Sequence, residues 1–135
     1  MEIKERQLEG IRILDLKGSL VAGEPCQMLR ESAQAGLEAK PKVILNLAEV
    51  DYIDSSGLGM LVSCYTTLDR AGGGLRILNP SERDMELMVL TKLSTVFQVF
   101  DDEQHAVNSF FAEREVKKFD ILDFVQTQRK LKEGK

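Results

Sequence analysis

A chain of 135 residues with 43% hydrophobic residues is long enough for one domain with its own core and a short additional segment. Its net charge of -4, with only one lysine-rich stretch, argues against nucleic-acid binding, which needs clustered Lys and Arg. No apolar run approaches the roughly 20 residues that cross a bilayer, and the charged N-terminus does not resemble a signal peptide. We therefore expect a cytoplasmic protein with no membrane contact.

The first part of the chain predicts two strands followed by a helix. Strands are expected over residues 3–8 and 11–17, joined by a turn at Glu9–Gly10, with Gly18 ending the second strand. A helix is expected from Pro25, because proline suits a first helical turn and apolar residues then recur every three or four positions.

The following segments alternate strands with helices. Val43–Leu47 predicts a strand covered on both faces, because its apolar residues form an almost continuous run. The later elements are expected to be a helix over 55–70, a strand over 75–78, a helix capped by Ser81 with Asp84, a strand over 96–100 and a helix over 101–111. This alternation predicts an α/β fold over residues 1–111, with a mostly parallel sheet packed with helices.

Residues 112–135 form a C-terminal extension whose apolar residues need cover. Five of them fall within seven positions: Phe119, Ile121, Leu122, Phe124 and Val125. Exposed together they would form an aggregation-prone patch. We expect the extension to be ordered and to cover the domain's own sheet, or alternatively to contact a second protomer in a homodimer. The basic residues 129–135 are expected to form a solvated face.

The two cysteines, Cys26 and Cys64, both fall on predicted helices. Their spacing matches neither a metal motif nor a disulfide framework. We expect two reduced thiols that pack in the interior.

Residues 51–60 join a buried strand to a helix, a position where function often sits in α/β folds. Ser55 is expected to cap the N-terminus of that helix. An apolar stripe beginning at Leu58 faces the sheet, which would turn Ser56, Met60 and Ser63 toward solvent.

Two glycines, Gly57 and Gly59, fall within one turn of the same helix although each lowers helix propensity by about 1 kcal/mol. Their presence suggests that another group approaches the bare backbone closely. Taken alone, however, the segment also fits an ordinary strand-to-helix turn with a cap.

Two motifs of this region are each complete: Leu45-Asn46-Leu47 and, after six intervening residues, Asp54-Ser55-Ser56-Gly57-Leu58-Gly59. The pattern resembles the signature of STAS-domain anti-sigma factor antagonists, in which a strand ending in Leu-Asn-Leu leads into Asp-Ser-Ser-Gly-Leu-Gly. The resemblance covers residues 3–111, with further agreement over 73–78 and 93–102.

The resemblance implies a partner-switching regulator that is not an enzyme and needs no cofactor or metal. Ser55 would be the phosphorylation site, and unphosphorylated protein would bind an anti-sigma factor and so release a sigma factor. That anti-sigma factor would also be the serine kinase, and a separate serine phosphatase would reset the switch. The partner-binding residues would be Asp54, Ser55, Ser56, Gly57, Gly59, Met60 and Ser63.

The chain departs from the family pattern in two places. Val21 stands where many members carry an acidic residue close to the phosphoacceptor, and residues 112–135 continue beyond the usual end of the domain. A second role for the same fold therefore stays open: a scaffold subunit of a stress-signalling or lipid-transport complex, without a phosphoswitch.

Two enzymatic alternatives fit the residues poorly. A hydrolase using Ser55 or Ser56 would need a Gly-x-Ser-x-Gly elbow and a histidine, and the single histidine, His105, lies on a separate predicted helix. A nucleotide site at Gly72–Gly74 is disfavoured because these glycines precede a strand, whereas a phosphate cradle opens a helix.

Overall fold

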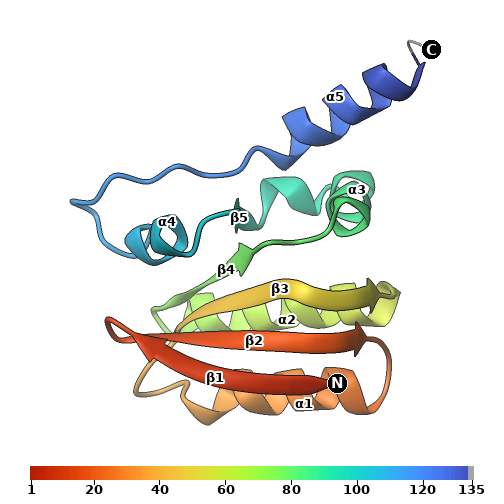
Figure 1. The fold of residues 1–135 in the computed structure, drawn as a ribbon. Coiled ribbons are helices and arrows are strands. Elements are labelled where there is room, and N and C mark those ends of the chain that lie inside the picture. The colour runs from red at the N-terminus through yellow and green to blue at the C-terminus, as the bar shows by residue number, and fades with distance from the viewer. Residues whose placement is uncertain (134–135) are drawn as a thin grey trace.

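The computed structural model of the chain describes residues 1–133 and has a five-stranded sheet at its centre (Figure 1). The strands are β1 (Glu2–Leu8), β2 (Ile11–Leu20), β3 (Lys42–Ile53), β4 (Gly74–Leu78) and β5 (Gln98–Phe100). The helices are α1 (Glu24–Ala35), α2 (Ser55–Arg70), α3 (Glu82–Leu90), the 3-10 turn η1 (Leu93–Thr95), α4 (Glu103–Asn108) and α5 (Ile121–Glu133). The predicted α/β fold is confirmed.

The strands lie in the sheet in their sequence order, with β1 antiparallel to β2 and every later neighbouring pair parallel. The turn between β1 and β2 is where the sequence predicted it, and both Glu9 and Gly10 have positive φ there, at 54° and 81°. A two-residue turn of this kind matches the twist of the strands it joins. The prediction that Gly18 ends β2 is wrong. The strand continues to Leu20, because its pairing with β3 resumes after a register shift beyond Gly18.

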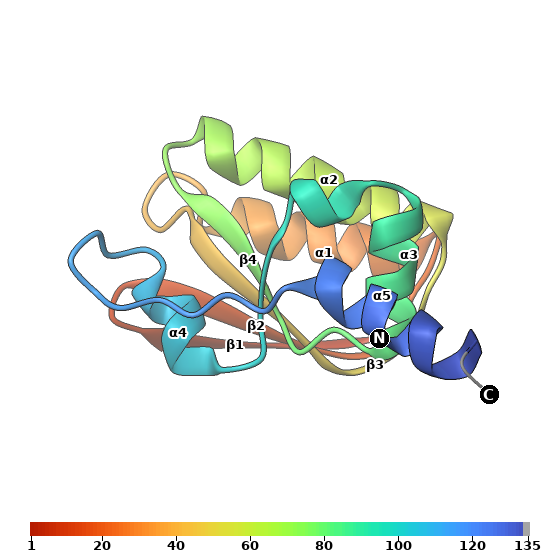
Figure 2. The same cartoon turned by 90° about the horizontal axis from the view of Figure 1, so that it is seen from above.

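Helices cover both faces of the sheet (Figure 2). Helices α1 and α2 lie on one face, over the larger of two hydrophobic clusters. Helix α4 covers a smaller cluster on the other face, around Ile13, Ile44 and Phe100. The helix predicted over 101–111 is shorter at both ends. Asp102 accepts the N–H of His105 and caps its start, and the helix ends at Asn108, where the backbone bonds of Phe110 and Phe111 change to three-residue turns.

A buried arginine ties α1 to the sheet. Arg12 is only 2% exposed, and its guanidinium donates to the carbonyl oxygens of Ser32 (2.8 Å), Ala33 (2.8 Å) and Lys40 (3.0 Å). The last carbonyls of a helix have no partner within the helix. Arg12 supplies that partner from β2, since the last turn of α1 contains no basic residue.

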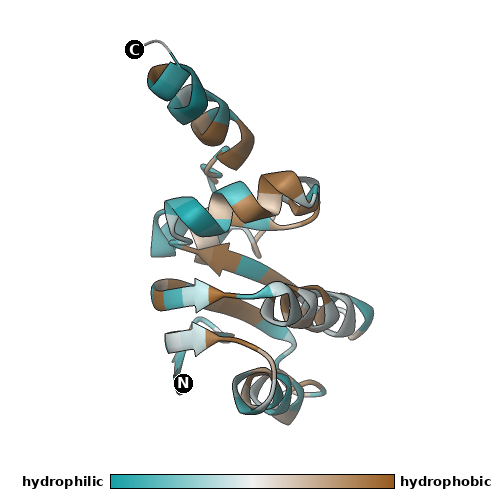
Figure 3. Cartoon of the chain, turned by 90° about the vertical axis from the view of Figure 1, so that its right-hand side faces the viewer, coloured by the Kyte–Doolittle hydropathy of each residue, from teal (hydrophilic) through white to brown (hydrophobic). Residues whose placement is uncertain are grey.

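The extension after α4 is attached to the domain at several points. Arg114 binds Glu9 at 2.7 Å, and the Phe119 N–H donates to the Val99 carbonyl at 2.8 Å. Helix α5 then packs on α3, with Ile121 and Val125 buried. Hydrophobic residues gather where α5 begins, and the rest of that helix is mostly hydrophilic (Figure 3). The extension thus covers its own domain, at the β5 edge of the sheet as well as against α3; a homodimer contact stays a prediction.

Candidate functional site

The N-terminus of α2 is capped by Asp54 and not, as the sequence suggested, by Ser55. One carboxylate oxygen of Asp54 accepts the N–H of Gly57 at 2.7 Å, and the other accepts the N–H of Ala22 at 3.1 Å. Aspartate is as good a cap as serine, which leaves Ser55 as the first residue of the helix. Asp54 therefore holds α2 against the loop between β2 and α1.

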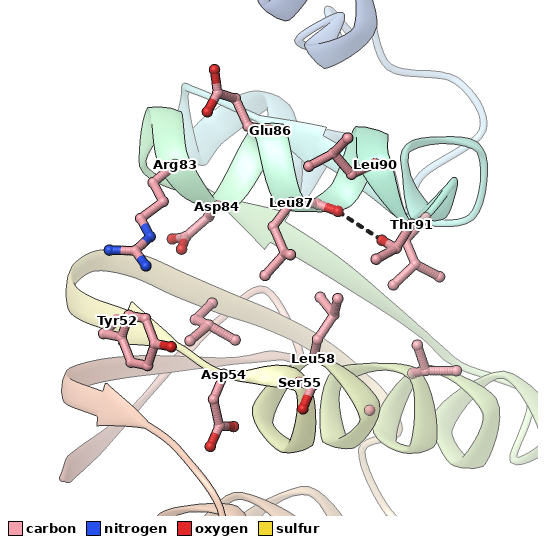
Figure 4. A pocket seen from close by; sticks show the side chains of 14 residues that line it. Tyr52, Asp54, Ser55, Leu58, Arg83, Asp84, Glu86, Leu87, Leu90 and Thr91 are labelled. Carbon is pink, nitrogen blue, oxygen red and sulfur yellow. Dashed lines mark hydrogen bonds between the residues drawn. The ribbon is translucent and has the colours of Figure 1, made fainter.

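These N–H groups also keep Asp54 ionised. The bond from Gly57, and then the bond from Ala22, hold the pKa of the Asp54 carboxyl below its usual value. Ser55, the next residue, is exposed. In Figure 4 its hydroxyl lies on the same side as the Asp54 carboxylate, directed away from α3. The hydroxyl is therefore accessible at a helix N-terminus, where backbone N–H groups and the helix dipole favour negative charge.

The expectation that Met60 faces solvent is wrong. Met60 is 8% exposed and belongs to the main hydrophobic cluster. Helix α2 packs on α1 as well as on the sheet, so its buried arc is wider than expected and includes Met60 and Cys64. The apolar stripe of a sequence underestimates the width of the buried arc when the helix packs on two neighbours. We therefore assign Met60 to the core.

Gly57 also lies inside the domain. A Cβ atom at this position would stand 2.1 Å from the carbonyl oxygen of Leu20. The close approach that the sequence indicated therefore comes from β2 of the same chain. At Gly59 a Cβ atom would meet nothing within 4 Å. Of the predicted binding residues, Ser55, Ser56, Gly59 and Ser63 are exposed.

Both cysteines pack in the interior, as predicted. Cys26 lies on α1 and Cys64 on α2. Burial raises the pKa of the Cys64 thiol to about 11, so the thiol stays protonated near neutral pH.

A groove that the sequence did not predict lies between α2 and α3, with a volume of about 590 Å³ (Figure 4). Its walls come from α2 (Ser55, Leu58 and Val62) and from α3 (Arg83, Leu87 and Leu90). Leu90 is 70% exposed, the highest value of any large hydrophobic side chain in residues 1–133. Ser55 therefore sits at the rim of an apolar groove.

A cation stands at one end of this groove. The Arg83 guanidinium lies 4.7 Å from the centre of the Tyr52 ring, and both residues line the groove. An arginine over an aromatic face is held by the ring's electrostatic field as well as by contact. The rim thus combines this cation with the Asp54 carboxylate.

Two features of the described part of the chain concern metal binding and its single histidine. Nowhere in residues 1–133 do three His, Cys, Asp or Glu side chains gather as a metal site would require. The Nδ1 atom of His105 accepts the N–H of Lys117 at 3.1 Å, so the single histidine is engaged by the extension and does not line the groove. Over the same residues, every helix is too short or too polar to cross a bilayer.

A profile of the STAS domain matches residues 2–106. The chain belongs to the STAS domain family. An anti-sigma-B factor antagonist of Listeria monocytogenes is 32% identical over 104 residues, a match that covers 73% of this chain and 86% of the relative. Two Thermotoga relatives are 29% identical over 66 residues, and the chain spans only 58% of their length.

Solved structures share this STAS fold at lower identity. A Thermotoga maritima protein aligns with a TM-score of 0.74 and 22% identity, over 80% of this chain and 93% of that protein. The anti-sigma factor antagonist SpoIIAA in its unphosphorylated form aligns with a TM-score of 0.62 and 19% identity, over 80% and 96%. A sulfate transporter family protein of Wolinella succinogenes aligns with a TM-score of 0.66 and 20% identity, over 76% and 85%. The α5 helix lies beyond the matched STAS residues.

Proposed function

We propose that this chain is an anti-sigma factor antagonist that works by partner switching. Unphosphorylated, it binds an anti-sigma factor that is also a serine kinase, and a sigma factor is released. Phosphorylation of Ser55 ends the binding, and a serine phosphatase restores it. The observation that carries this proposal is the exposed Ser55 at the start of α2, beside an apolar groove. The Listeria relative's name supports it.

The surface we assign to the partner is called the docking face below. It consists of Asp54, Ser55, Ser56, Gly59, Ser63, Arg83, Leu87 and Leu90. The exposed Leu90 and the groove beside it supply apolar area that burial would stabilise. The polar residues of α2 form the rim, which is the usual arrangement of a protein–protein contact.

Phosphorylation would act on binding and leave the fold intact. A phosphate adds roughly -1.5 to -2 charges at neutral pH. On Ser55 this charge meets the first turn of α2, where the helix dipole favours anions. A partner that covers the site must instead desolvate the phosphate next to the charged Asp54. Burying an unpaired charge costs several kcal/mol, enough to turn a nanomolar complex into a micromolar one.

The test uses purified histidine-kinase-like ATPases encoded in the genome that carries this chain. We expect one of them, with ATP and Mg²⁺, to add a single phosphate to Ser55, found by mass spectrometry of the peptide from Ile53 to Arg70. Ser55→Ala should bind that ATPase and take no phosphate, whereas Ser55→Asp should fold and bind poorly. Ser56→Ala is the matched control and should still be phosphorylated.

Two outcomes would contradict this assignment. Loss of the phosphate in Ser56→Ala but not in Ser55→Ala would move the acceptor by one residue. If neither change affects modification or binding, the scaffold role without a phosphoswitch takes its place. The shared fold of the Wolinella sulfate transporter family protein is compatible with that second role, in which a transporter or stress-signalling assembly would retain the unmodified chain.

A further inference from the structure

The basic end of α5 lies beside the start of α3. Helix α5 crosses α3 at a steep angle (Figures 1 and 2). Residues 118–122, around the start of α5, share a groove with residues 94–99, whereas Lys132 near its end reaches Glu82 at the start of α3. The Nζ atom of Lys132 is 3.6 Å from a carboxylate oxygen of Glu82. Figure 1 shows α5 rising past α3, with its last turns projecting from the domain.

Helix α3 stands between the end of α5 and the groove of the docking face, and it is in contact with both (Figure 4). Glu82 contacts Lys132, and the next residue, Arg83, stacks on Tyr52. Arg83 and Tyr52 line the same groove as Ser55. A partner that covers the groove and also extends over α3 would reach the last turns of α5. Standard protein–protein contacts bury about 800 Å² on each side.

The cations of this segment are not used inside the domain. Arg129 and Lys130 are exposed and form no ion pair with any residue from 1 to 133, and the one pair of Lys132 is largely exposed. Leu131 between them is 59% exposed. Three cations in four positions thus project from a chain whose net charge is -4.

We infer that Arg129, Lys130 and Lys132 form a second contact for the same anti-sigma partner and receive an acidic surface on it. The inference rests on the proposed function and specifies one further property of the partner, an acidic surface. Exposed charges at the edge of a contact raise the association rate more than they slow dissociation. The extension therefore steers the partner toward the groove.

The test compares two double variants that change the net charge equally. Arg129→Glu with Lys130→Glu reverses the basic end of α5, and Arg70→Glu with Lys118→Glu is the matched control at exposed positions outside the docking face. Association rates are measured with the ATPase identified above, at about 50 mM and about 200 mM salt. We expect the first pair to slow association about tenfold at low salt and less at high salt, and the control to change it less than about twofold.

The outcomes separate this inference from the proposed function. If Leu90→Glu abolishes binding while the Arg129/Lys130 variant matches the control, the docking face stands and the second contact is wrong. Binding to phosphatidylserine vesicles that needs Arg129 and Lys130, with unchanged partner kinetics, would assign the segment to a membrane surface and overturn the inference. If no ATPase binds the wild-type chain, both proposals fail. Thermal unfolding of each variant checks that the fold is kept.

Discussion

Gly57 and Gly59 lie in the same turn of α2, yet their surroundings are opposite. A Cβ atom on Gly57 would stand 2.1 Å from the backbone of β2, and one on Gly59 would meet open space. The inner side of this turn is therefore fixed by the domain itself. On the outer side, no contact among residues 1–133 requires a glycine at position 59, and the close approach of a partner would supply a reason for it. Within one helical turn, Gly57 is therefore required by the fold, whereas Gly59 is a candidate for a role in binding.

The largest expected effect is that of Gly57→Ala. The added methyl group would collide with the Leu20 carbonyl, and neither backbone can move without disturbing β2 or α2. A collision of backbone with backbone belongs to the overpacking changes that cost more than about 3 kcal/mol, well above the roughly 1 kcal/mol that alanine returns in helix propensity. The midpoint of thermal unfolding should therefore fall by about 10 °C. An unchanged midpoint would show that the approach to Leu20 is not close.

Met60→Ala should rank second. Met60 is 8% exposed in the main core, and truncating a buried methionine costs about 2–5 kcal/mol, the lower end being expected beside the rim. Urea unfolding should give a lower midpoint with an unchanged slope. Ser63→Ala, one turn away on the exposed side, is the matched control and should stay within about 0.5 kcal/mol of the wild type.

Gly59→Ala should act in the opposite direction. Alanine fits the helix without a collision, so the free energy of unfolding should rise by up to about 1 kcal/mol. If the bare backbone at Gly59 serves the docking face, the same variant should weaken binding to the ATPase partner while the fold becomes more stable. A variant that is more stable and binds equally well would remove Gly59 from the docking face.

The smallest expected effect concerns pH. The Asp54 pKa is held below its ordinary value of 3.8, so the charged form stabilises the fold above that pH, and the contribution is lost as pH falls through the lowered pKa. Asp54→Asn keeps a capping side chain without the charge. The wild type should therefore melt at a higher temperature than this variant near pH 6. The difference should shrink as the pH is lowered below about 4. A constant difference down to strongly acidic pH would contradict the role of the charge.

Local signals in the sequence predicted much of the fold. The Glu9–Gly10 turn and the Ser81–Asp84 capping box both appear where expected, because each depends on residues a few positions apart. The end of β2 was missed because a glycine can either end a strand or mark a register shift within it. Only the pairing with β3 decides between the two. Arg12 was missed because its partners are carbonyl groups at residues 32–40, which no side-chain pattern reveals.

The site was predicted in part. The motif around Ser55 marked the correct strand-to-helix junction, and Ser56 and Ser63 are exposed as expected. Met60 was misplaced because a second neighbour of α2 widens the buried arc. The groove was missed because its walls come from helices about thirty residues apart in sequence. The local signal of the groove is a pair of apolar residues of α3, Leu87 and Leu90, that do not share the buried side of Met85 and Met88.

The strands of the sheet follow one another in space as they do in sequence, and this order has a consequence for synthesis of the chain. Domains generally fold as units while the chain is synthesised at about 5–20 residues per second. Each new strand here can join the edge of strands already made. Helix α5, which supports the outer side of α3, is added after them. The α3 wall of the groove is therefore synthesised a few seconds after Ser55, and its outer support, α5, follows last.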